Sequence, residues 1–296
     1  MSRGRRGRGS GAEGGAGRHA RRGLLLLFLA AVTVGFQERP RRYWGGGGWR
    51  PEPYREGLPT TAGGATDRGF TFCRLLYQSV RREPLGHGWN TDYPGSDWNF
   101  MERLEELTTV RPAHWADGQP GFAVVRPSQD ELFECPFLFA SDVGSAGFSE
   151  AEVERLRTYL LKGGMLWVDD FWGEWAWHNW ATEIGRVLPG LPIVDVPSNH
   201  RLLEMLYDVP RVPQVPSIQF WRRTGRRETS EQGPDSRTPH LRAIFDERGR
   251  PLVVMTHNTD IADGWEREGE DDEFFYAFSP DAYALGINIV LYALTH

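Results

Sequence analysis

The stretch "GGMLWVDDFWGEWAWHNW", residues 163–180, contains an apolar run, two adjacent aspartates and several tryptophans. The run 165–168 is short and has no polar member, which predicts a strand buried on both faces of a parallel sheet. Asp169 and Asp170 then stand at the carboxyl end of that strand. Two interpretations stay open: these carboxylates belong to a functional site, or Asp170 caps the helix that follows.

The segments on both sides of this strand predict helices. Residues 148–164, "FSEAEVERLRTYLLKGG", begin with Ser149 and place Glu152 three residues later, the pattern of a capping box, and Gly163 ends the apolar periodicity. Residues 174–190 follow as a second helix that ends at a Pro-Gly pair. The chain therefore reads helix, strand, helix around the aspartates.

The same alternation extends over most of the chain. Strands are predicted at 70–77, 122–127, 136–141, 165–170, 192–196, 241–246 and 252–258, and further helices at 96–108 and 279–296. Strands that alternate with helices predict an α/β fold with a three-layer, doubly wound, mostly parallel sheet and helices on both faces. One domain, residues 67–296, accounts for the pattern, with the polar stretch 221–239 as an inserted loop.

Two further helix starts are predicted from local chemistry. Ser96 or Asp97 is expected to cap the helix 96–108. Ser279 is expected to cap the last helix, with Pro280 at its first position.

The first 66 residues differ in composition from the rest. Residues 1–36 contain seven arginines, one glutamate and the apolar run 24–36, which predicts an export signal or a membrane anchor. The Arg21-Arg22 pair before the run loosely matches a twin-arginine signal. Residues 37–66 are rich in Gly, Pro and Arg and predict a linker. We expect an exported domain, periplasmic or anchored in the inner membrane by this segment.

The charge of the remainder excludes one class of partner. Of 34 basic and 40 acidic residues, 27 and 39 lie beyond residue 36, so this part has a net charge of −12. An acidic body repels phosphate backbones, and we expect no nucleic-acid partner.

The two cysteines lie in or beside apolar, strand-like runs. An exported protein could pair Cys73 with Cys135, but a free Cys also behaves as a small buried hydrophobe, and both alternatives stay open. No C-x-x-C or Cys/His cluster exists, which excludes a cysteine-type zinc site.

Polar residues follow several predicted strands. In such sheets, ligands bind in the crevice beyond the carboxyl ends of the strands. The candidates at this edge are Asp142, Asp169, Asp170, His257, Asn258 and Asp260. The cluster around His257 is equally consistent with a well-bonded turn.

Other candidates come from single residues. Trp265 could be a stacking platform or a packing residue, and His200 a ligand or a helix cap. Asp92 and Tyr93 lie in a polar and aromatic loop that is also expected at the carboxyl edge. Trp172, Trp175, Trp177 and Trp180 do not all fit one helical face, and His178 lies among them, so this segment predicts either an exposed patch or core packing.

Several signatures are absent from the sequence. There is no G-x-S-x-G, no phosphate-binding loop and no G-x-G-x-x-G between a strand and a helix. We therefore expect no serine nucleophile, no nucleotide, no resident metal and no cofactor.

Long segments carry a family resemblance. Residues 132–173, "SNHRLLEMLYDV" (198–209), "GRPLVVMTHNTDIADGWE" (249–266) and "YALGINIVLYALT" (283–295) together resemble the bacterial domain-of-unknown-function family 4159. The resemblance implies a fold like that of class I glutamine amidotransferases and a place in the cell envelope. It implies no established reaction. The amidotransferase cysteine nucleophile has no counterpart here, so glutaminase activity is not expected, and of the family's His-Pro-x-Phe only His200 is kept.

Three functions follow as hypotheses. The first is an exported or membrane-tethered domain that binds a small polar ligand, a glycan or a peptide, at the carboxyl edge. The second is a hydrolase that uses a carboxylate or a metal-bound water, with Asp169 or Asp170 as the base and His257 as ligand or acid. The third is a scaffold that binds an envelope protein.

Overall fold

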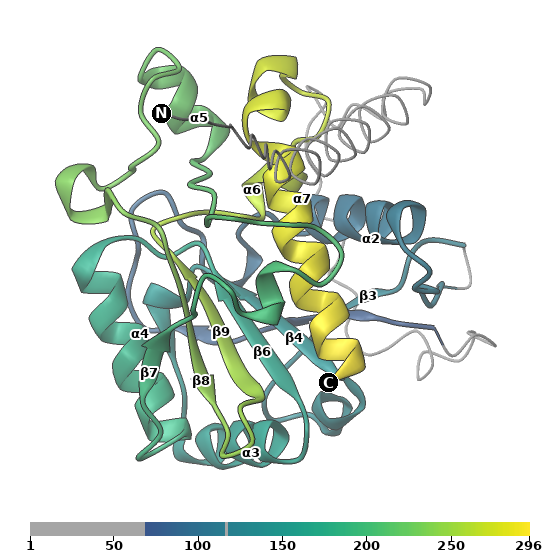
Figure 1. Cartoon of the computed structure of the whole chain (residues 1–296). Helices are drawn as coiled ribbons and strands as arrows, with labels where there is room; N and C mark the ends of the chain where they lie inside the picture. Colours follow the sequence, from purple (N-terminus) through teal and green to yellow (C-terminus); the bar gives the residue numbers. More distant parts are fainter. Residues whose placement is uncertain (1–68, 116–117) are drawn as a thin grey trace, which may run out of the picture. The chain divides into compact units, whose positions relative to one another are not determined.

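Seven strands of the described residues form one sheet in the order β3-β1-β4-β6-β9-β8-β7 (Figure 1). This computed structural model describes residues 69–115 and 118–296. The parallel strands are β1 (Phe72–Leu75), β3 (Phe122–Val125), β4 (Phe137–Ser141), β6 (Met165–Asp169) and β9 (Pro251–His257). The strands β8 (His240–Phe245) and β7 (Ile193–Asp195) complete the sheet through antiparallel pairs. The predicted α/β fold with a mostly parallel sheet is confirmed.

The order of the parallel strands locates the place where a ligand binds in folds of this kind. Counted along the chain, the five parallel strands have the spatial order 2-1-3-4-5, which is the flavodoxin-like order of doubly wound sheets. The order reverses between β1 and β4. Loops that leave these two strands in opposite directions form a crevice beyond their carboxyl ends.

Helices cover both faces of this sheet (Figure 1). On one face, α3 (Glu150–Leu161) and α4 (Gly173–Val187) contribute buried apolar side chains to a core shared with the strands. On the other, α2 (Gly95–Leu107), α6 (Asp263–Glu266) and α7 (Asp272–Thr295) pack against one another and against aromatic strand residues. All residues of β1, β3, β4, β6 and β9 are buried, as strands covered on both faces require.

Smaller elements connect these layers. They are β2 (Gln78–Ser79), β5 (Ala146–Gly147), α5 (Ile218–Arg223), η1 (Gly88–Asn90), η2 (Asp130–Glu134), η3 (Val143–Ser145), η4 (Arg201–Leu203) and η5 (Gly233–Ser236). The strands β2 and β5 form a separate antiparallel pair beside the carboxyl edge. The predicted loop 221–239 contains the end of α5 and all of η5.

One predicted helix cap is confirmed. The Ser149 side chain accepts a hydrogen bond from the Glu152 amide, and the Glu152 carboxylate accepts one from the Ser149 amide. The local sequence was sufficient here because both partners of the box lie within one turn.

The predicted caps of α2 and α7 are wrong. The N-cap of α2 is Pro94, which has no side-chain bond, and Ser96 and Asp97 lie inside the first turn, buried against Arg74. Asp271 caps α7, and the helix continues through Pro280. At α2, tertiary contacts with Arg74 engage the two side chains that were expected to cap the helix. At α7, an earlier cap, Asp271, starts the helix before Ser279.

The two cysteines form a disulfide that joins β1 to the segment before β4. The structure joins the two sulfurs, so the alternative that the sequence left open is decided in favour of the bond. Both cysteines are buried. The predicted signal 1–36, with its apolar run 24–36, and the predicted linker 37–66 lie outside the described residues. By length and composition α7 could cross a membrane, but it is mostly buried within the domain.

Candidate functional site

Three neighbouring strands end in residues with the same unusual backbone conformation. Asp142 after β4, Asp170 after β6 and Asn258 after β9 have φ angles of 54°, 55° and 62°. This left-handed region is uncommon outside glycine, and Asp and Asn are the side chains that tolerate it best. Such conformations cluster at functional sites, where the surrounding structure stabilises them.

A cavity of about 720 Å³ opens at this edge of the sheet. Its walls come from the segment after β1, from the ends of β4 and β6, and from the segment after β9, so it lies at the point where the strand order reverses. Eight carboxyl groups line it: Glu83, Asp92, Asp142, Asp170, Glu231, Asp260, Asp263 and Glu266. The positively charged or titratable nitrogen groups on its walls are fewer: Arg81, Arg82, His87 and Arg267. The cavity is therefore acidic.

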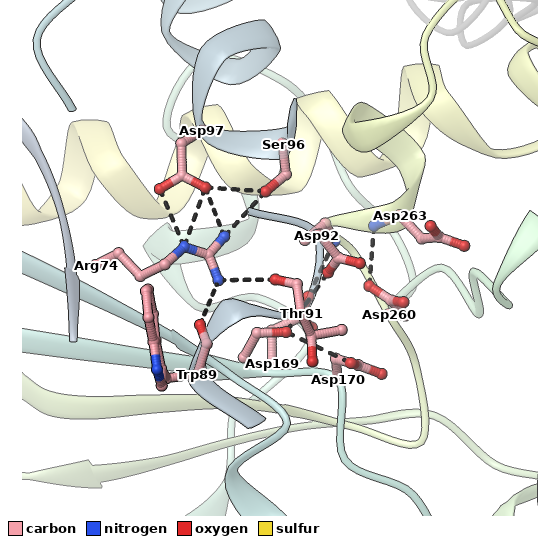
Figure 2. A network of polar contacts seen from close by, with 12 residues as sticks. Arg74, Trp89, Thr91, Asp92, Ser96, Asp97, Asp169, Asp170, Asp260 and Asp263 are labelled. Carbon is pink, nitrogen blue, oxygen red and sulfur yellow. Dashed lines mark hydrogen bonds and ion pairs between the residues drawn. The ribbon is translucent and has the colours of Figure 1, made fainter. Parts of the chain in front are cut away.

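Three of these carboxyl groups form a cluster (Figure 2). Oxygens of Asp92, Asp260 and Asp263 all lie within 4.8 Å of one another. Asp260 accepts a hydrogen bond from the Asp263 amide at 2.9 Å, and Asp263 accepts one from the Ile218 amide at 2.7 Å. Three oxygen ligands at this spacing could hold a hard cation such as Mg²⁺ or Ca²⁺.

Burial makes the charged forms of this cluster unfavourable. Burial first, and then the nearby Glu266, raise the pKa of Asp92 and of Asp263 well above the ordinary value. Burial and the neighbouring Asp170 do the same to the pKa of Asp260. A positively charged ligand would reverse these shifts, because it stabilises the charged carboxylates.

Arg74 positions the segment that carries Asp92. Its guanidinium is fully buried, binds both oxygens of Asp97, and donates to the carbonyls of Trp89 and Thr91 (Figure 2). The guanidinium also lies over the ring of Phe139 from β4, 4.9 Å from its centroid. One side chain of the sheet therefore fixes both α2 and the loop before it.

The adjacent aspartates that end β6 have different roles. Asp170 lines the cavity and accepts hydrogen bonds from the Trp172 indole at 3.0 Å and from the Ser141 hydroxyl at 3.4 Å. Asp169 points into the protein, where it accepts from the Thr256 hydroxyl at 2.5 Å and from the Ala262 amide at 3.0 Å. Neither of them caps α4.

The electrostatics of the two aspartates also differ. Burial raises the pKa of Asp169 to about 7, although its hydrogen bonds lower it. Burial and the charges of Asp92 and Asp142 raise the pKa of Asp170 well above its ordinary value. Asp169 thus fixes the segment after β9, whereas Asp170 presents a carboxyl to the cavity.

Asp142 forms a carboxyl pair with Glu83. Both residues are buried, and Oε2 of Glu83 and Oδ1 of Asp142 have no hydrogen-bond partner among the described residues. The two carboxyl groups interact, and Asp142 raises the pKa of Glu83. Glu83 also accepts from the Trp172 amide at 3.0 Å, and Asp142 from the Gly88 amide at 2.5 Å. Since carboxylates only accept hydrogen bonds, a bond between them requires one shared proton.

His257 and Asn258 lie beside the cavity but do not line it. The Nδ1 of His257 accepts from Arg242, so its Nε2 carries the proton and donates to the carbonyl of Gly173. Burial lowers the pKa of His257 to about 3. Asn258 accepts from the Gly173 amide at 2.8 Å and donates to the carbonyl of Thr238. Both side chains hold the start of α4.

Trp265 and His200 lie elsewhere. The Trp265 ring is fully buried, 4.5 Å from the Phe100 centroid, and has no open face. His200 caps η4 and packs against Phe245, at the amino end of the sheet and hence opposite the cavity. The structure thus brings Asp142, Asp170 and Asp260 together on the cavity wall, and Asp92 with them.

The tryptophans of α4 divide between surface and interior. Trp180 is buried, Trp175 is about half exposed with Arg81 stacked on it, and Trp172 lines the cavity. His178 is exposed. No single exposed aromatic face exists on this helix.

Sequence reasoning missed Glu83, Glu231 and Glu266. Glu83 lies in the segment "RREPLGHG", which has no strand or helix pattern, and Asp142, the carboxyl group with which it interacts, lies more than fifty residues away. Asp263 offered a signal, because it belongs to the polar cluster that follows β9.

Comparison with known proteins returns one family. A family model described as "Domain of unknown function (DUF4159)" matches residues 71–294. No curated protein matches the chain.

Proposed function

Because this chain belongs to the DUF4159 family, whose description names no reaction, we propose its function from its own cavity. The domain binds a small polar ligand, a glycan or a peptide, at the carboxyl edge of the sheet. The ligand enters with a positively charged amine, as an amino sugar or a basic peptide would. The observation that carries this proposal is the excess of carboxyl groups in a cavity at the reversal point of the strand order.

Physical chemistry favours an amine over a neutral or anionic group. Several carboxyl groups here are buried, and a buried charge is costly unless it is paired. An ammonium group donates three hydrogen bonds and supplies the missing charge. Trp172 on the wall offers apolar surface for the rest of the ligand.

Matched probes test this proposal. Glucosamine is compared with N-acetylglucosamine, and N-acetyl-lysine amide with N-acetyl-norleucine amide, by calorimetric titration at low salt. The charged member of at least one pair is expected to bind about tenfold or more tightly than its neutral partner, a difference of about 1.4 kcal/mol. Asp92→Asn should weaken that binding, whereas Asp195→Asn, which removes an exposed acid on β7, should not.

Equal binding of charged and neutral members would contradict the proposal. So would binding that Asp92→Asn leaves unchanged, because Asp92 lies in the carboxylate cluster and the one hydrogen bond of its side chain among the described residues is long, 3.5 Å from Ser141.

A cation-dependent hydrolase is the second candidate, and the spacing of Asp92, Asp260 and Asp263 favours it. A cation held there would activate a water molecule at neutral pH. His257 is not available as its ligand, because both ring nitrogens are engaged. Metal analysis of the purified protein and the effect of a chelator on its melting temperature test this candidate. No bound metal and no shift in melting temperature would eliminate it.

We propose further that the fold is a variant of the class I glutamine-amidotransferase-like arrangement. The 2-1-3-4-5 order of the parallel strands supports this relation. Glutaminase activity is not part of the proposal, because Cys73 and Cys135 are both in the disulfide and the described residues contain no free thiol.

The location that we propose is outside the cytoplasm, in the periplasm or at the inner membrane, with residues 1–36 as signal or anchor and 37–66 as linker. The disulfide supports it, since such bonds persist in oxidising compartments. Cell fractionation followed by alkaline extraction of the membranes would separate an anchored form from a released one. Recovery in the cytoplasm would contradict both.

A further inference from the structure

Residues 81–88 form one wall of the acidic cavity. Every residue of this segment lines the cavity, and most of them are exposed. The segment has no regular structure before η1, and Leu85 has a φ of 69° and is about half exposed. Its position therefore depends on a few specific contacts.

Two carboxyl groups supply the hydrogen bonds that join this wall to the sheet edge. Glu83, within the segment, accepts from the Trp172 amide at the start of α4. Asp142, at the end of β4, accepts from the Gly88 amide. Arg81 also stacks on Trp175. The two ends of the segment are held by the Val80 amide, which donates to the Ser145 carbonyl, and by the His87 amide, which donates to the Thr91 hydroxyl.

The same two carboxyl groups face each other. Oε2 of Glu83 and Oδ1 of Asp142 are both buried without a hydrogen-bond partner among the described residues. A Cβ atom at Gly144 would lie only 2.6 Å from both Glu83 carboxyl oxygens, and one at Gly86 would overlap the Asp142 carboxyl. The chain therefore leaves room for this contact, and no other donor is placed to satisfy either oxygen.

We propose that Glu83 and Asp142 form a proton-operated latch on the cavity. With one proton between them, the pair ties residues 81–88 to the sheet edge. Loss of that proton leaves two buried carboxylates in contact, and their repulsion releases the segment and opens the cavity. The release of the segment does not depend on any ligand. Its use as a gate for a ligand rests on the proposed function.

The surroundings of the pair set the direction of the switch. Burial first, and then Asp142, raise the pKa of Glu83 well above its usual value, and burial raises that of Asp142. The other titratable groups that act on the pair are Asp170 after β6, Tyr77 after β1 and His87 on the segment itself. Asp170 disfavours a second negative charge, and a protonated His87 would favour it. Burial and the neighbouring acids therefore move the loss of the shared proton to higher pH, so we expect release as the pH rises.

Glu83→Gln is the matched test variant. The glutamine has nearly the shape of the protonated glutamate, accepts from the Trp172 amide with its oxygen and donates to Asp142 with its nitrogen at every pH. Glu83→Ala removes the tie. Limited digestion with trypsin, followed by mass spectrometry, measures cleavage after Arg81 and Arg82, which are exposed on the segment.

The rates of cleavage are measured at about pH 7 and about pH 10. Each rate is divided by the rate for Glu83→Gln at the same pH, because this ratio removes the effect of pH on the protease itself. For the wild type, we expect a ratio near one at pH 7 and a rise of about tenfold or more at pH 10. Glu83→Ala should be cleaved rapidly at both pH values, and circular dichroism checks that it is folded.

Two results would overturn the latch. One is a wild-type ratio that does not change with pH. The other is release by a chelator at pH 7, which would show that a cation and not a proton joins the two carboxyl groups. Neither measurement uses a ligand, so failure here is distinct from failure of the binding proposal.

Discussion

At the scale of single residues, the buried carboxyl groups of the cavity lower the stability of the fold and provide ligands for a cation. Burial raises the pKa values of Asp92, Asp260 and Asp263, so the folded protein holds protons that the unfolded chain has released. The free energy of unfolding therefore falls as the pH rises from the ordinary pKa of an aspartate toward the raised pKa of the folded state. A bound cation would restore the lost stability. Buried carboxyl groups with raised pKa values are typical of functional sites.

Arg74 gives the first prediction. Arg74→Met removes the cation but leaves the Asp97 carboxylate buried, which should lower the free energy of unfolding by about 3–5 kcal/mol. Arg74→Met/Asp97→Leu removes both charges and should recover most of that loss. Urea denaturation of the two variants measures this. A single variant within 1 kcal/mol of the wild type would show that the ion pair does not position α2.

His257 gives a prediction about pH. The folded state keeps this imidazole neutral down to a pKa of about 3, whereas the unfolded chain binds a proton below about 6.5. Between these values the unfolded state holds the extra proton, so acidification favours unfolding. The stability advantage of the wild type over His257→Gln should therefore shrink below pH 6.5, by at most about 1.4 kcal/mol per pH unit.

Urea denaturation of both proteins at several pH values between 7.5 and 4 makes this measurement. The glutamine does not titrate, and all other groups are common to both proteins. A difference in stability that stays constant with pH would mean that His257 is not held neutral.

At the scale of elements, α4 is capped from outside its own sequence. Trp172, at the N-cap, offers no side-chain acceptor, and instead Asn258 and Asp235 accept from the amides of Gly173 and Glu174. The first turn of the helix is thus satisfied by the ends of two other segments. This fixes Trp172 and Asp170 on the cavity wall.

Asn258 contributes side-chain hydrogen bonds and a left-handed backbone conformation, and the variants Asn258→Gly and Asn258→Ala separate these two contributions. Glycine keeps the left-handed backbone and removes only the side-chain bonds, which should cost about 1 kcal/mol. Alanine also has to adopt a φ of 62°, which should cost about 1–2 kcal/mol more. Thermal or urea denaturation checks the order wild type, glycine, alanine. Equal stability of the two variants would contradict the role of the backbone conformation.

The elements also show how far the sequence alone reaches. Apolar runs predicted every strand of the main sheet, and the capping box predicted the start of α3, because these signals are local. The start of α7 was placed at Ser279 instead of Asp271, since Ser-Pro is a strong local cap signal that the longer helix overrides. The strand ends Asp142 and Asp170 were identified from position alone. The partner of Asp142 was not, because the contact with Glu83 exists only in three dimensions.

At the scale of the whole molecule, charge and topology act together. The chain has a net charge of −6, and its acidic groups converge where the strand order reverses. A concave acidic site focuses the field and attracts cations over a distance of about one Debye length, roughly 8–10 Å at physiological salt. Binding of an amine should therefore weaken as salt increases.

The disulfide gives the last prediction, and it concerns the whole domain. Cys73 and Cys135 enclose 62 residues of sequence separation, a loop that contains α2, β3 and the segment with Glu83 and Asp92. The bond restricts the unfolded chain, and loop-closure entropy for this length sets an upper limit of about 4 kcal/mol. Replacing both residues by alanine should therefore lower the free energy of unfolding by about 2–4 kcal/mol. Urea denaturation measures the loss, and thiol titration of the denatured wild type, with no reductant, should find no free thiol. Two free thiols would mean that the bond is absent, and an unchanged stability would mean that the bond does not stabilise the domain.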